Sequence, residues 1–563
     1  MFKQKIGELL SKQLNLKEED VLKMLERPQK PEFGDYAFPC FGLAMKAKEN
    51  PFKYASKIVD QLNEKLPKEI EKTEVKGAYI NFFLNKKVLA ENVLKKIMDQ
   101  KSSYGGSSEG KGKTIVIDYS SPNIAKPMSI GHLRSTIIGN SLLNIFSILG
   151  YKTVGINYLG DYGTQFGKLL VAYKKWGKQY NLDKDPIKTL LELYQKFHAE
   201  VEAHPELEDD ARMEFKKIEE GNKENLELWK KFRELSVKDF KRIYAMMNVK
   251  FDVWSGESLY IKKAKALANS LKKKKIAVES AESFIVSLED FNMPPCLITK
   301  SDGTTLYATR DLAASIDRNK KYKFDQMIYV TGSEQKLHFQ QIFKVLEIIG
   351  EKFWDKCHHV YSGMIYSKSG KISSRKSGKE LVFMVDVINE AISESHKFIS
   401  TEMKDKEKDK IAQQVGVSAI IYADLSNDKI KDVEFDWDKI LRLEGNSGPY
   451  LQYSYRRASS ILEKEKFSGK FSIKEMNDEE KMIVNKLSQF PEAVENAAIH
   501  YAPHIIANYA NELAQLFNNF YEKCQVLKAE KVVKGQRLAI VSAVKQVLAN
   551  SLKLLGMQAP DKM

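Results

Sequence analysis

The pattern of apolar and polar positions divides the chain into segments of different secondary structure. Residues 1–100 open with helical periodicity and close with an aromatic-rich strand at 75–85. Residues 114–119 form a β-branched apolar run typical of a buried strand, and the apolar positions from Leu133 onward predict a helix. Strand-like residues return at 326–331, followed by a glycine turn and another helix. This alternation predicts an α/β fold with a doubly wound parallel sheet.

Helical periodicity dominates two further parts of the chain. The segment from about 170 to 290 predicts charged helices, which we interpret as an insertion between the two halves of the sheet. After residue 437 the chain is almost wholly helical, with apolar stripes at 485–490, 505–517 and 538–548. The C-terminal part is therefore predicted to be an all-α helical bundle.

Composition at the junctions indicates where domains begin and end. Residues 101–113 are rich in serine and glycine, which is typical of a flexible connection. A chain of 563 residues holds several domains, because single cores rarely exceed about 250–300 residues. We expect an N-terminal α/β domain at 1–100, a sheet-containing domain at 110–440 and the helical bundle at 441–563.

Charge and cysteine content restrict the class of protein. The net charge of +15 fits a polyanionic partner such as RNA, although well-solvated lysine-rich faces would give the same excess. The cysteines lack CxxC spacing, which argues against a disulfide framework and a structural zinc. The N-terminus is amphipathic, and no apolar run approaches the ~20 residues of a membrane span. We expect a soluble, cytoplasmic protein without membrane association.

The turn between the strand at 114–119 and the following helix is suited to binding phosphate. Pro122 restricts the chain, and Gly131 allows a ligand to approach the helix N-terminus, where N–H groups and the helix dipole favour an anion. His132 follows as a hydrogen-bond donor. For Gly131 and His132 alone, an ordinary turn entering a helix is the alternative interpretation. The turn has neither GxxxxGK[ST] nor GxGxxG.

The wider sequence around this turn carries a family resemblance. Residues 121–135, SPNIAKPMSIGHLRS, resemble the "HIGH" signature of class I aminoacyl-tRNA synthetases and, in their flanks, the arginyl-tRNA synthetases. Residues 371–375, KISSR, resemble the second signature, "KMSKS", within a basic, serine-rich loop at 367–378. Residues 157–167 and 306–312 also match the arginyl family. The resemblance covers nearly the whole chain and is least diagnostic in the inserted helices.

The resemblance implies an activity and a domain organisation. The activity is that of an arginine--tRNA ligase, which activates L-arginine with ATP to arginyl-adenylate and transfers arginine to the 3' end of tRNA(Arg). Residues 110–440 would form the Rossmann-type catalytic domain, 1–100 a domain that binds the tRNA elbow, and 441–563 the anticodon-binding bundle. ATP would enter with Mg²⁺ as a substrate complex, with no tightly bound metal or organic cofactor, and the protein would be a monomer.

The resemblance also assigns roles to individual residues. The expected catalytic residues are Lys126, Ser129, His132, Lys371 and Ser373. The expected ATP-binding residues are Pro122, Ser129, Gly131, His132, Gly332, Glu334 and Lys371. The expected arginine-binding residues are Asp118 and Asp311 for the guanidinium, Tyr307 for its plane, and Asn123 and Gln335 for the α-amino end. The expected tRNA-binding residues are Tyr79, Asn81, Tyr453, Arg456 and Arg457.

Two positions depart from the class I signatures. Ser129 stands where "HIGH" has its first histidine, and Ser374 stands where "KMSKS" has its second lysine. A serine hydroxyl can donate one hydrogen bond, but it is short and uncharged. In the arginyl family a lysine before "HIGH" is thought to replace the missing lysine, and Lys126 occupies that position.

Two other functions remain open at this point. One is a class I synthetase for another amino acid, such as glutamate or lysine, although two acids directed at the substrate side chain disfavour glutamate. The other is a catalytically silent RNA-binding relative, suggested by Ser129 and Ser374. The retained pocket residues Asn123, Tyr307 and Asp311 argue against that alternative.

Overall fold

The chain forms two compact units in its computed structural model. The described residues are 2–28, 30–182, 184–281, 283–300, 303–367, 370–371, 383–399, 403–442, 444–560 and 562. One unit comprises 1–104, 458–489 and 515–547, and the other comprises 105–457, 490–514 and 548–563. The division into domains at 1–100, 110–440 and 441–563 stays a prediction.

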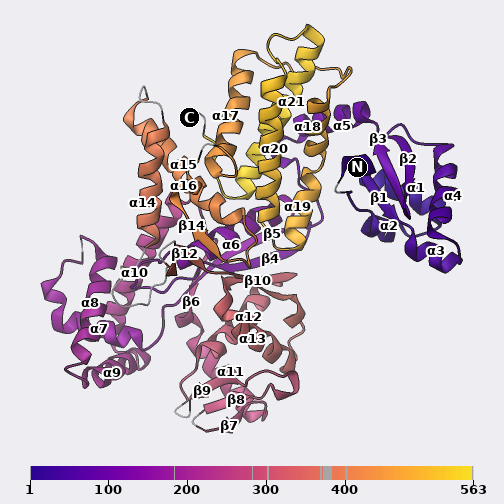
Figure 1. Cartoon of the computed structure of the whole chain (residues 1–563). Coiled ribbons are helices and arrows are strands. Elements are labelled where there is room, and N and C mark those ends of the chain that lie inside the picture. Colours follow the sequence, from indigo (N-terminus) through magenta and orange to yellow (C-terminus); the bar gives the residue numbers. More distant parts are fainter. Residues whose placement is uncertain are drawn as a thin grey trace. The chain divides into compact units, whose positions relative to one another are not determined.

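A five-stranded parallel sheet forms the centre of the larger unit (Figure 1). Its strand order is β11-β10-β4-β5-β6, so the first strand in sequence lies beside the fourth. This is the doubly wound order, and ligands bind in such sheets where the order reverses, here between β4 and β10. The predicted α/β fold is confirmed. The strands are β4 (Thr114–Tyr119), β5 (Lys152–Leu159), β6 (Val253–Gly256), β10 (Gln326–Gly332) and β11 (Cys357–Ser362).

Helices cover both faces of this sheet (Figure 1). Helix α6 (Gly131–Ile148) follows β4 and packs closely on it, because a Cβ on Gly139 would lie 2.3 Å from the ring of Tyr119. Helices α12 (Tyr307–Tyr322) and α13 (Lys336–Ile348) pack on the apolar face that includes buried residues of β4, β5 and β10. The loops that enter α6 and α13 leave from the carboxyl ends of β4 and β10.

The insertion between β5 and β6 is helical, but the predicted helical stretch of 170–290 extends too far. It ends at α10, and β6 of the central sheet then follows. A helix and a small antiparallel sheet come next; their strands of three to five residues are too short to show a clear period of two. These elements are α7 (Gln165–Trp176), α8 (Pro186–Val201), α9 (Leu207–Glu219), α10 (Lys223–Met246), α11 (Ile261–Lys273), β7 (Val278–Ser280), β8 (Ser283–Val286) and β9 (Cys296–Lys300).

The N-terminal part of the smaller unit contains an antiparallel sheet in the order β1-β3-β2. Buried Asp35 fixes the end of β3, because it accepts hydrogen bonds from the backbone N–H of Leu84 at 2.8 Å and from Lys86 Nζ at 2.6 Å. The elements are α1 (Phe2–Leu14), α2 (Glu18–Met24), β1 (Tyr36–Pro39), α3 (Phe41–Ala47), α4 (Pro51–Asn63), β2 (Ile70–Lys76), β3 (Tyr79–Leu84) and α5 (Lys86–Gln100).

The C-terminal part of the chain is helical, as predicted. Helices α17, α20 and α21 each have residues in both compact units. Among the described residues, no helix combines the length and apolar character of a membrane span. Between the central sheet and the C-terminal helices lie β12 (Ile365–Ser367), β13 (Gly370–Lys371), α14 (Met384–Ser395), α15 (Asp405–Leu425) and β14 (Val433–Phe435). The C-terminal helices are α16 (Trp437–Ile440), α17 (Gly448–Lys464), α18 (Asp478–Ser488), α19 (Phe490–Ile499), α20 (His504–Lys523) and α21 (Lys531–Leu554).

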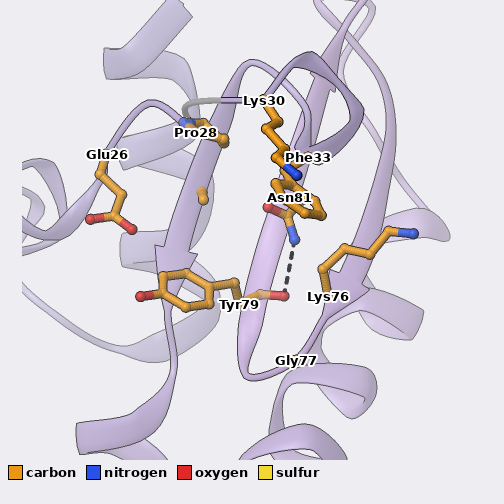
Figure 2. A pocket seen from close by; sticks show the side chains of 9 residues that line it. Glu26, Pro28, Lys30, Phe33, Lys76, Gly77, Tyr79 and Asn81 are labelled. Atoms are coloured by element: carbon orange, nitrogen blue, oxygen red, sulfur yellow. Dashed lines mark hydrogen bonds between the residues drawn. The ribbon is translucent and has the colours of Figure 1, made fainter.

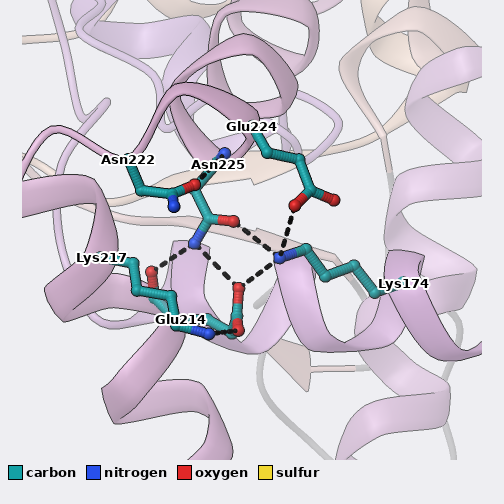
Figure 3. A network of polar contacts seen from close by, with 6 residues as sticks. All are labelled: Lys174, Glu214, Lys217, Asn222, Glu224 and Asn225. Atoms are coloured by element: carbon teal, nitrogen blue, oxygen red, sulfur yellow. Dashed lines mark hydrogen bonds and ion pairs between the residues drawn. The ribbon is translucent and has the colours of Figure 1, made fainter.

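A polar network joins three helices of the insertion (Figure 3). The Glu214 carboxylate on α9 accepts from Lys174 on α7 at 2.6 Å, from Lys217 at 2.6 Å and from Asn225 on α10 at 2.8 Å. Burial favours the neutral acid, but these hydrogen bonds outweigh it and lower the pKa of Glu214 to about 2. Asn222 caps α10 by accepting from the N–H of Asn225 at 3.1 Å.

The network predicts an acid-sensitive contribution to stability. Because the folded-state pKa of Glu214 lies below the ordinary 4.5, its stabilisation is complete above about pH 4.5 and is lost as the pH falls toward 2. Glu214→Gln should reduce stability at pH 7 by on the order of 1–3 kcal/mol and flatten the acid limb. Thermal unfolding of the full chain followed by circular dichroism between pH 7 and 3 measures both effects.

Glu224→Gln provides the matched control, because Glu224 is mostly exposed and lies 3.9 Å from the same Lys174. This variant should unfold as the wild type does. Equal acid sensitivity of Glu214→Gln and the wild type would contradict the prediction.

Candidate active site

A cavity of about 860 Å³ lies at the carboxyl ends of β4 and β10, where the strand order reverses. Most of the residues expected to bind arginine or ATP line it, although they come from separate parts of the sequence. Pro122 and Lys126 are not among the lining residues. The predicted residues that line the cavity are Asp118, Asn123, Ser129, Gly131, His132, Tyr307, Asp311, Gly332, Glu334 and Gln335.

The loop that leaves β4 has an unusual backbone conformation. Ser120, Ser121 and Ala125 have φ values of 69°, 46° and 60°, in the left-handed region that side chains other than glycine rarely adopt. The N–H of Ala125 donates to Ser236 Oγ on α10 at 2.8 Å. A buried hydroxyl chain holds Ser120, whose Oγ lies 2.6 Å from the Tyr244 hydroxyl of α10. The inserted helix α10 therefore holds the loop in this conformation.

The loop ends where α6 begins, at Gly131. Ser129 Oγ lies 3.1 Å from Nδ1 of His132, so the two side chains are paired at the N-terminus of the helix. Burial lowers the pKa of His132, and the imidazole is therefore neutral at pH 7. A neutral imidazole next to a helix N-terminus can donate to a phosphate oxygen or to a ribose oxygen without carrying a charge.

The segment at 157–167, which begins within the last residues of β5, supports Asn123. Gly160 forms an isolated parallel bridge with Asn123, and the N–H of Gly160 donates to the carbonyl of Pro122 at 3.1 Å. A Cβ on Gly160 would lie only 1.9 Å from Oδ1 of Asn123. Glycine is therefore required for Asn123 to hold its position at the cavity wall.

Asp311 and Tyr307, four residues apart on α12, both line the cavity as the helical spacing predicted. Asp311 Oδ2 lies 2.7 Å from Nε2 of His338, at the start of α13. Tyr307 is 54% exposed, and its ring lies 4.6 Å, centroid to centroid, from the His338 ring. His338 thus orients both residues, a role that the sequence did not indicate.

Asp118 also lines the cavity, but it is already paired. Its Oδ2 lies 2.7 Å from Nη1 of Arg318 on α12, and its Oδ1 accepts from Ser121 Oγ at 2.8 Å. Burial raises the pKa of Asp118, and the Arg318 charge opposes that shift. Asp118 was expected to bind the substrate guanidinium. In the structure, the guanidinium of Arg318 already pairs with this carboxylate.

Two charged residues of the cavity wall were not among the predicted site residues. Glu257 follows β6 and accepts from Arg310 Nε at 2.8 Å, and burial raises its pKa to about 7. Arg134 on α6 pairs with Asp424 on α15 through Nε and Oδ1 at 2.6 Å, and both side chains are buried. Arg134 lies inside the recognised signature, but Glu257 stands in no motif that could have indicated it.

The two lysines predicted to act on phosphates lie in different parts of the structure. The Lys126 ammonium lies 4.5 Å from the ring centroid of Tyr194 on α8, in the insertion. Lys371 pairs through its backbone with Tyr366 in the strand pair β12–β13. Ser373 and most of the loop at 367–378 lie outside the described residues, and so does Ser374.

A second cavity, of about 600 Å³, lies in the N-terminal part of the chain and includes Tyr79 and Asn81 (Figure 2). The Phe33 ring and the side chains of Lys30 and Lys76 also line it. It therefore combines aromatic surface with positive charge, a combination that suits a nucleotide.

The predicted tRNA-binding residues of α17 share one face of that helix, because Tyr453, Arg456 and Arg457 are three and four positions apart. The Arg457 guanidinium lies 4.8 Å from the Tyr453 ring centroid, and Tyr453 is 40% exposed. In the described part of the chain, no group of three or more His, Cys, Asp or Glu residues could hold a metal ion.

Comparison with known proteins identifies the family. Residues 93–437 match the family "tRNA synthetases class I (R), catalytic domain", residues 451–563 match the DALR anticodon binding domain, and residues 1–84 match the arginyl tRNA synthetase N terminal domain. The arginine--tRNA ligases of Clostridioides difficile and Halothermothrix orenii are each 44% identical to this chain, and each alignment covers 100% of both proteins.

Solved structures show the same fold. The arginyl-tRNA synthetase of Thermus thermophilus superimposes with a TM-score of 0.83 at 23% identity, over 100% of both chains. That of Plasmodium falciparum superimposes with a TM-score of 0.82 at 25% identity, over 100% of this chain and 99% of the other. Full-length identity above 40% to arginine--tRNA ligases, together with the matching domains, shows that the chain belongs to the arginyl-tRNA synthetases, a family of class I aminoacyl-tRNA ligases.

Proposed function

We propose that the cavity between the ends of β4 and β10 is where this arginine--tRNA ligase joins L-arginine to ATP and then transfers arginine to tRNA(Arg). The observation that carries this proposal is the convergence, at the reversal point of the sheet, of residues expected for both small substrates. The carboxylate of arginine attacks the α-phosphorus, the bond to pyrophosphate breaks, and arginyl-adenylate results. A ribose hydroxyl at the tRNA 3' end then attacks the activated carbonyl and releases AMP.

The arginine side chain is proposed to bind at the start of α12. Asp311 uses Oδ2 for His338, while Oδ1 has no hydrogen-bond partner among the described residues and can receive a guanidinium N–H. The exposed ring of Tyr307 can lie against the guanidinium plane. Asn123 and Gln335, on the cavity wall, would hold the α-amino end.

ATP is proposed to bind across the two loops that leave β4 and β10. Gly131 and His132 at the start of α6 would contact phosphate, and Glu334 beside Gly332 would accept hydrogen bonds from ribose hydroxyls. Magnesium would enter as the MgATP complex and would neutralise phosphate charge. The protein mainly positions the reactants and stabilises charge in such an in-line displacement. Roles for Lys371 and Ser373 stay predictions.

The tRNA is proposed to contact two further surfaces. The cavity lined by Tyr79 and Asn81 would take an unpaired base of the tRNA elbow, with Lys30 and Lys76 next to its phosphates (Figure 2). Tyr453 and the arginines of α17 would contact tRNA at the entry to the anticodon-binding helices. Monomeric state and cytoplasmic location stay predictions.

Asp311→Asn tests the arginine pocket. A neutral amide cannot pair a buried guanidinium as a carboxylate does, so arginine activation should weaken by about 3–5 kcal/mol, a factor of roughly 10² to nearly 10⁴. Arginine-dependent exchange of labelled pyrophosphate into ATP, with tRNA present, measures this loss. Asp317→Asn is the control, because Asp317 lies on the same helix and pairs with Lys263. Normal exchange by Asp311→Asn would remove the pocket assignment.

Lys126→Ala tests the proposed phosphate contact. If the ammonium acts on the transition state, kcat should fall by on the order of 10² to 10³ while the KM for arginine changes little. Tyr194→Leu is the companion variant, because it removes only the ring on which Lys126 lies. It should keep most of the kcat. An equal loss of kcat and of thermal stability in both variants would show that the contact between Lys126 and Tyr194 has a structural role.

Tyr79→Ala tests the cavity of the N-terminal part. Loss of base stacking should weaken tRNA binding by about 1–3 kcal/mol, and the KM for ATP should remain unchanged. Filter binding of labelled tRNA(Arg) measures the affinity. Phe52→Ala serves as control, because Phe52 is 54% exposed in the same part of the chain but does not line the cavity. Equal tRNA affinity of both variants would argue against base binding there.

A further inference from the structure

One face of helix α10 carries polar side chains that anchor two loops of the catalytic cavity. Trp229, Arg233, Ser236 and Tyr244 are four, three and eight positions apart, so they lie on the same side of the helix. Ser236 and Tyr244 are buried, and Arg233 is 26% exposed at its side chain. Each of the four forms a hydrogen bond to a loop that follows a strand of the central sheet.

Trp229 and Arg233 hold the loop that follows β5. Trp229 Nε1 donates to the carbonyl of Asp161 at 2.9 Å, and Arg233 Nε donates to Asp161 Oδ2 at 2.9 Å. Asp161 is completely buried, so its carboxylate depends on such partners. The backbone next to Gly160 is therefore fixed by α10.

Ser236 and Tyr244 hold the loop that follows β4. Ser236 Oγ accepts from the N–H of Ala125 at 2.8 Å. The Tyr244 hydroxyl accepts from the side-chain amide of Asn157 at 3.0 Å, so its own proton can be donated to Ser120 Oγ, 2.6 Å away. Burial raises the pKa of Tyr244, so the hydroxyl keeps this proton at neutral pH. Both ends of residues 120–125 are thus tied to α10.

The two loops meet at Asn123. The N–H of Gly160 donates to the carbonyl of Pro122 at 3.1 Å, and the N–H of Ile124 donates to the carbonyl of Gly160 at 3.2 Å. These bonds form the parallel bridge between Asn123 and Gly160. One helix face therefore fixes the position of Asn123 from both sides.

The guanidinium end of the proposed pocket is held by other elements. Tyr307 and Asp311 lie on α12, and His338 of α13 contacts both. The four hydrogen bonds from the α10 face reach neither α12 nor α13. A change at Tyr244 should therefore affect one end of the substrate and not the other.

We propose, on the basis of the arginine pocket assigned above, that this face of α10 sets the specificity for the α-amino group of arginine. By fixing both loops, it holds the Asn123 amide where that amide accepts a hydrogen bond from the α-ammonium group. Tyr244 and Ser236 act as positioning residues, because they reach the substrate only through the loop. A guanidino acid without an α-amino group gains nothing from this arrangement and binds through its guanidinium end alone.

Tyr244→Phe tests the proposal, because it removes the hydroxyl and keeps the ring that packs on Phe251 and Trp254. The probe is δ-guanidinovaleric acid, which is arginine without its α-amino group, used as a competitor in arginine-dependent exchange of pyrophosphate into ATP with tRNA(Arg) present. In the wild type its inhibition constant should exceed the KM for arginine by about ten- to a hundredfold, the contribution of one hydrogen bond to a charged group. In Tyr244→Phe the KM for arginine should rise by about tenfold, while the inhibition constant stays unchanged.

Ser236→Ala is a second variant, which leaves the N–H of Ala125 without this partner and should change the preference in the same direction. Tyr119→Phe is the matched control, because its buried hydroxyl donates to the carbonyl of Lys250 at 3.1 Å and to neither loop. It should keep the wild-type preference for arginine over the analogue. A loss of thermal stability can occur in all three variants, whereas a smaller preference is expected only in Tyr244→Phe and Ser236→Ala.

Three results would overturn the proposal, and they identify which step is wrong. If Tyr244→Phe raises the KM and the inhibition constant in equal proportion, or changes neither, α10 only supports the fold. If Asn123→Ala removes the preference for arginine while Tyr244→Phe and Ser236→Ala keep it, the pocket assignment stands and only this inference fails. If Asn123→Ala also keeps the preference, the assignment of Asn123 to the α-amino end is wrong, and the inference fails with it.

Discussion

The loop between β4 and α6 is the constraint on which the site depends. Three of its residues that are not glycine hold positive φ values, and such conformations cost of order 1–3 kcal/mol each unless the surroundings enforce them. Here Ser236 and Tyr244 of α10 bond to the loop, so an inserted helix stabilises the backbone that carries Asn123 and the start of α6. The insertion is therefore part of the catalytic architecture and not an addition to its surface.

The sequence predicted the fold where its signals were local. The β-branched run before Asp118 and the turn before Leu133 identified the strand, loop and helix, because buried parallel strands and helix N-termini depend on neighbouring residues. Strand β6 was missed, since its four residues have no visible alternation and depend on pairing with β5 across the insertion. The small sheet β7–β9 was missed because its strands, which pair with their neighbours in sequence, are only three to five residues long.

Only part of the site was predicted, because some of its residues depend on partners that are distant in the sequence. Residues within recognised motifs, such as Asp311 and His132, line the cavity as expected. Glu257 was missed because its partner Arg310 lies 53 positions away, and no local pattern indicates such a pair. The pairing of Asp118 with Arg318 was invisible for the same reason, although it changes what Asp118 can bind. Motifs identify which residues are present, but only the fold shows which charges are already neutralised.

The buried pair between Arg134 and Asp424 has a consequence for how this sequence can change over time. It joins the helix that begins at the nucleotide site to α15, and Arg134 Nη1 also donates to the carbonyl of Lys431 at 2.7 Å. Losing either charge alone would leave the other buried without compensation. The two positions can therefore diverge only together, and a chimaera of two relatives must inherit both from the same parent.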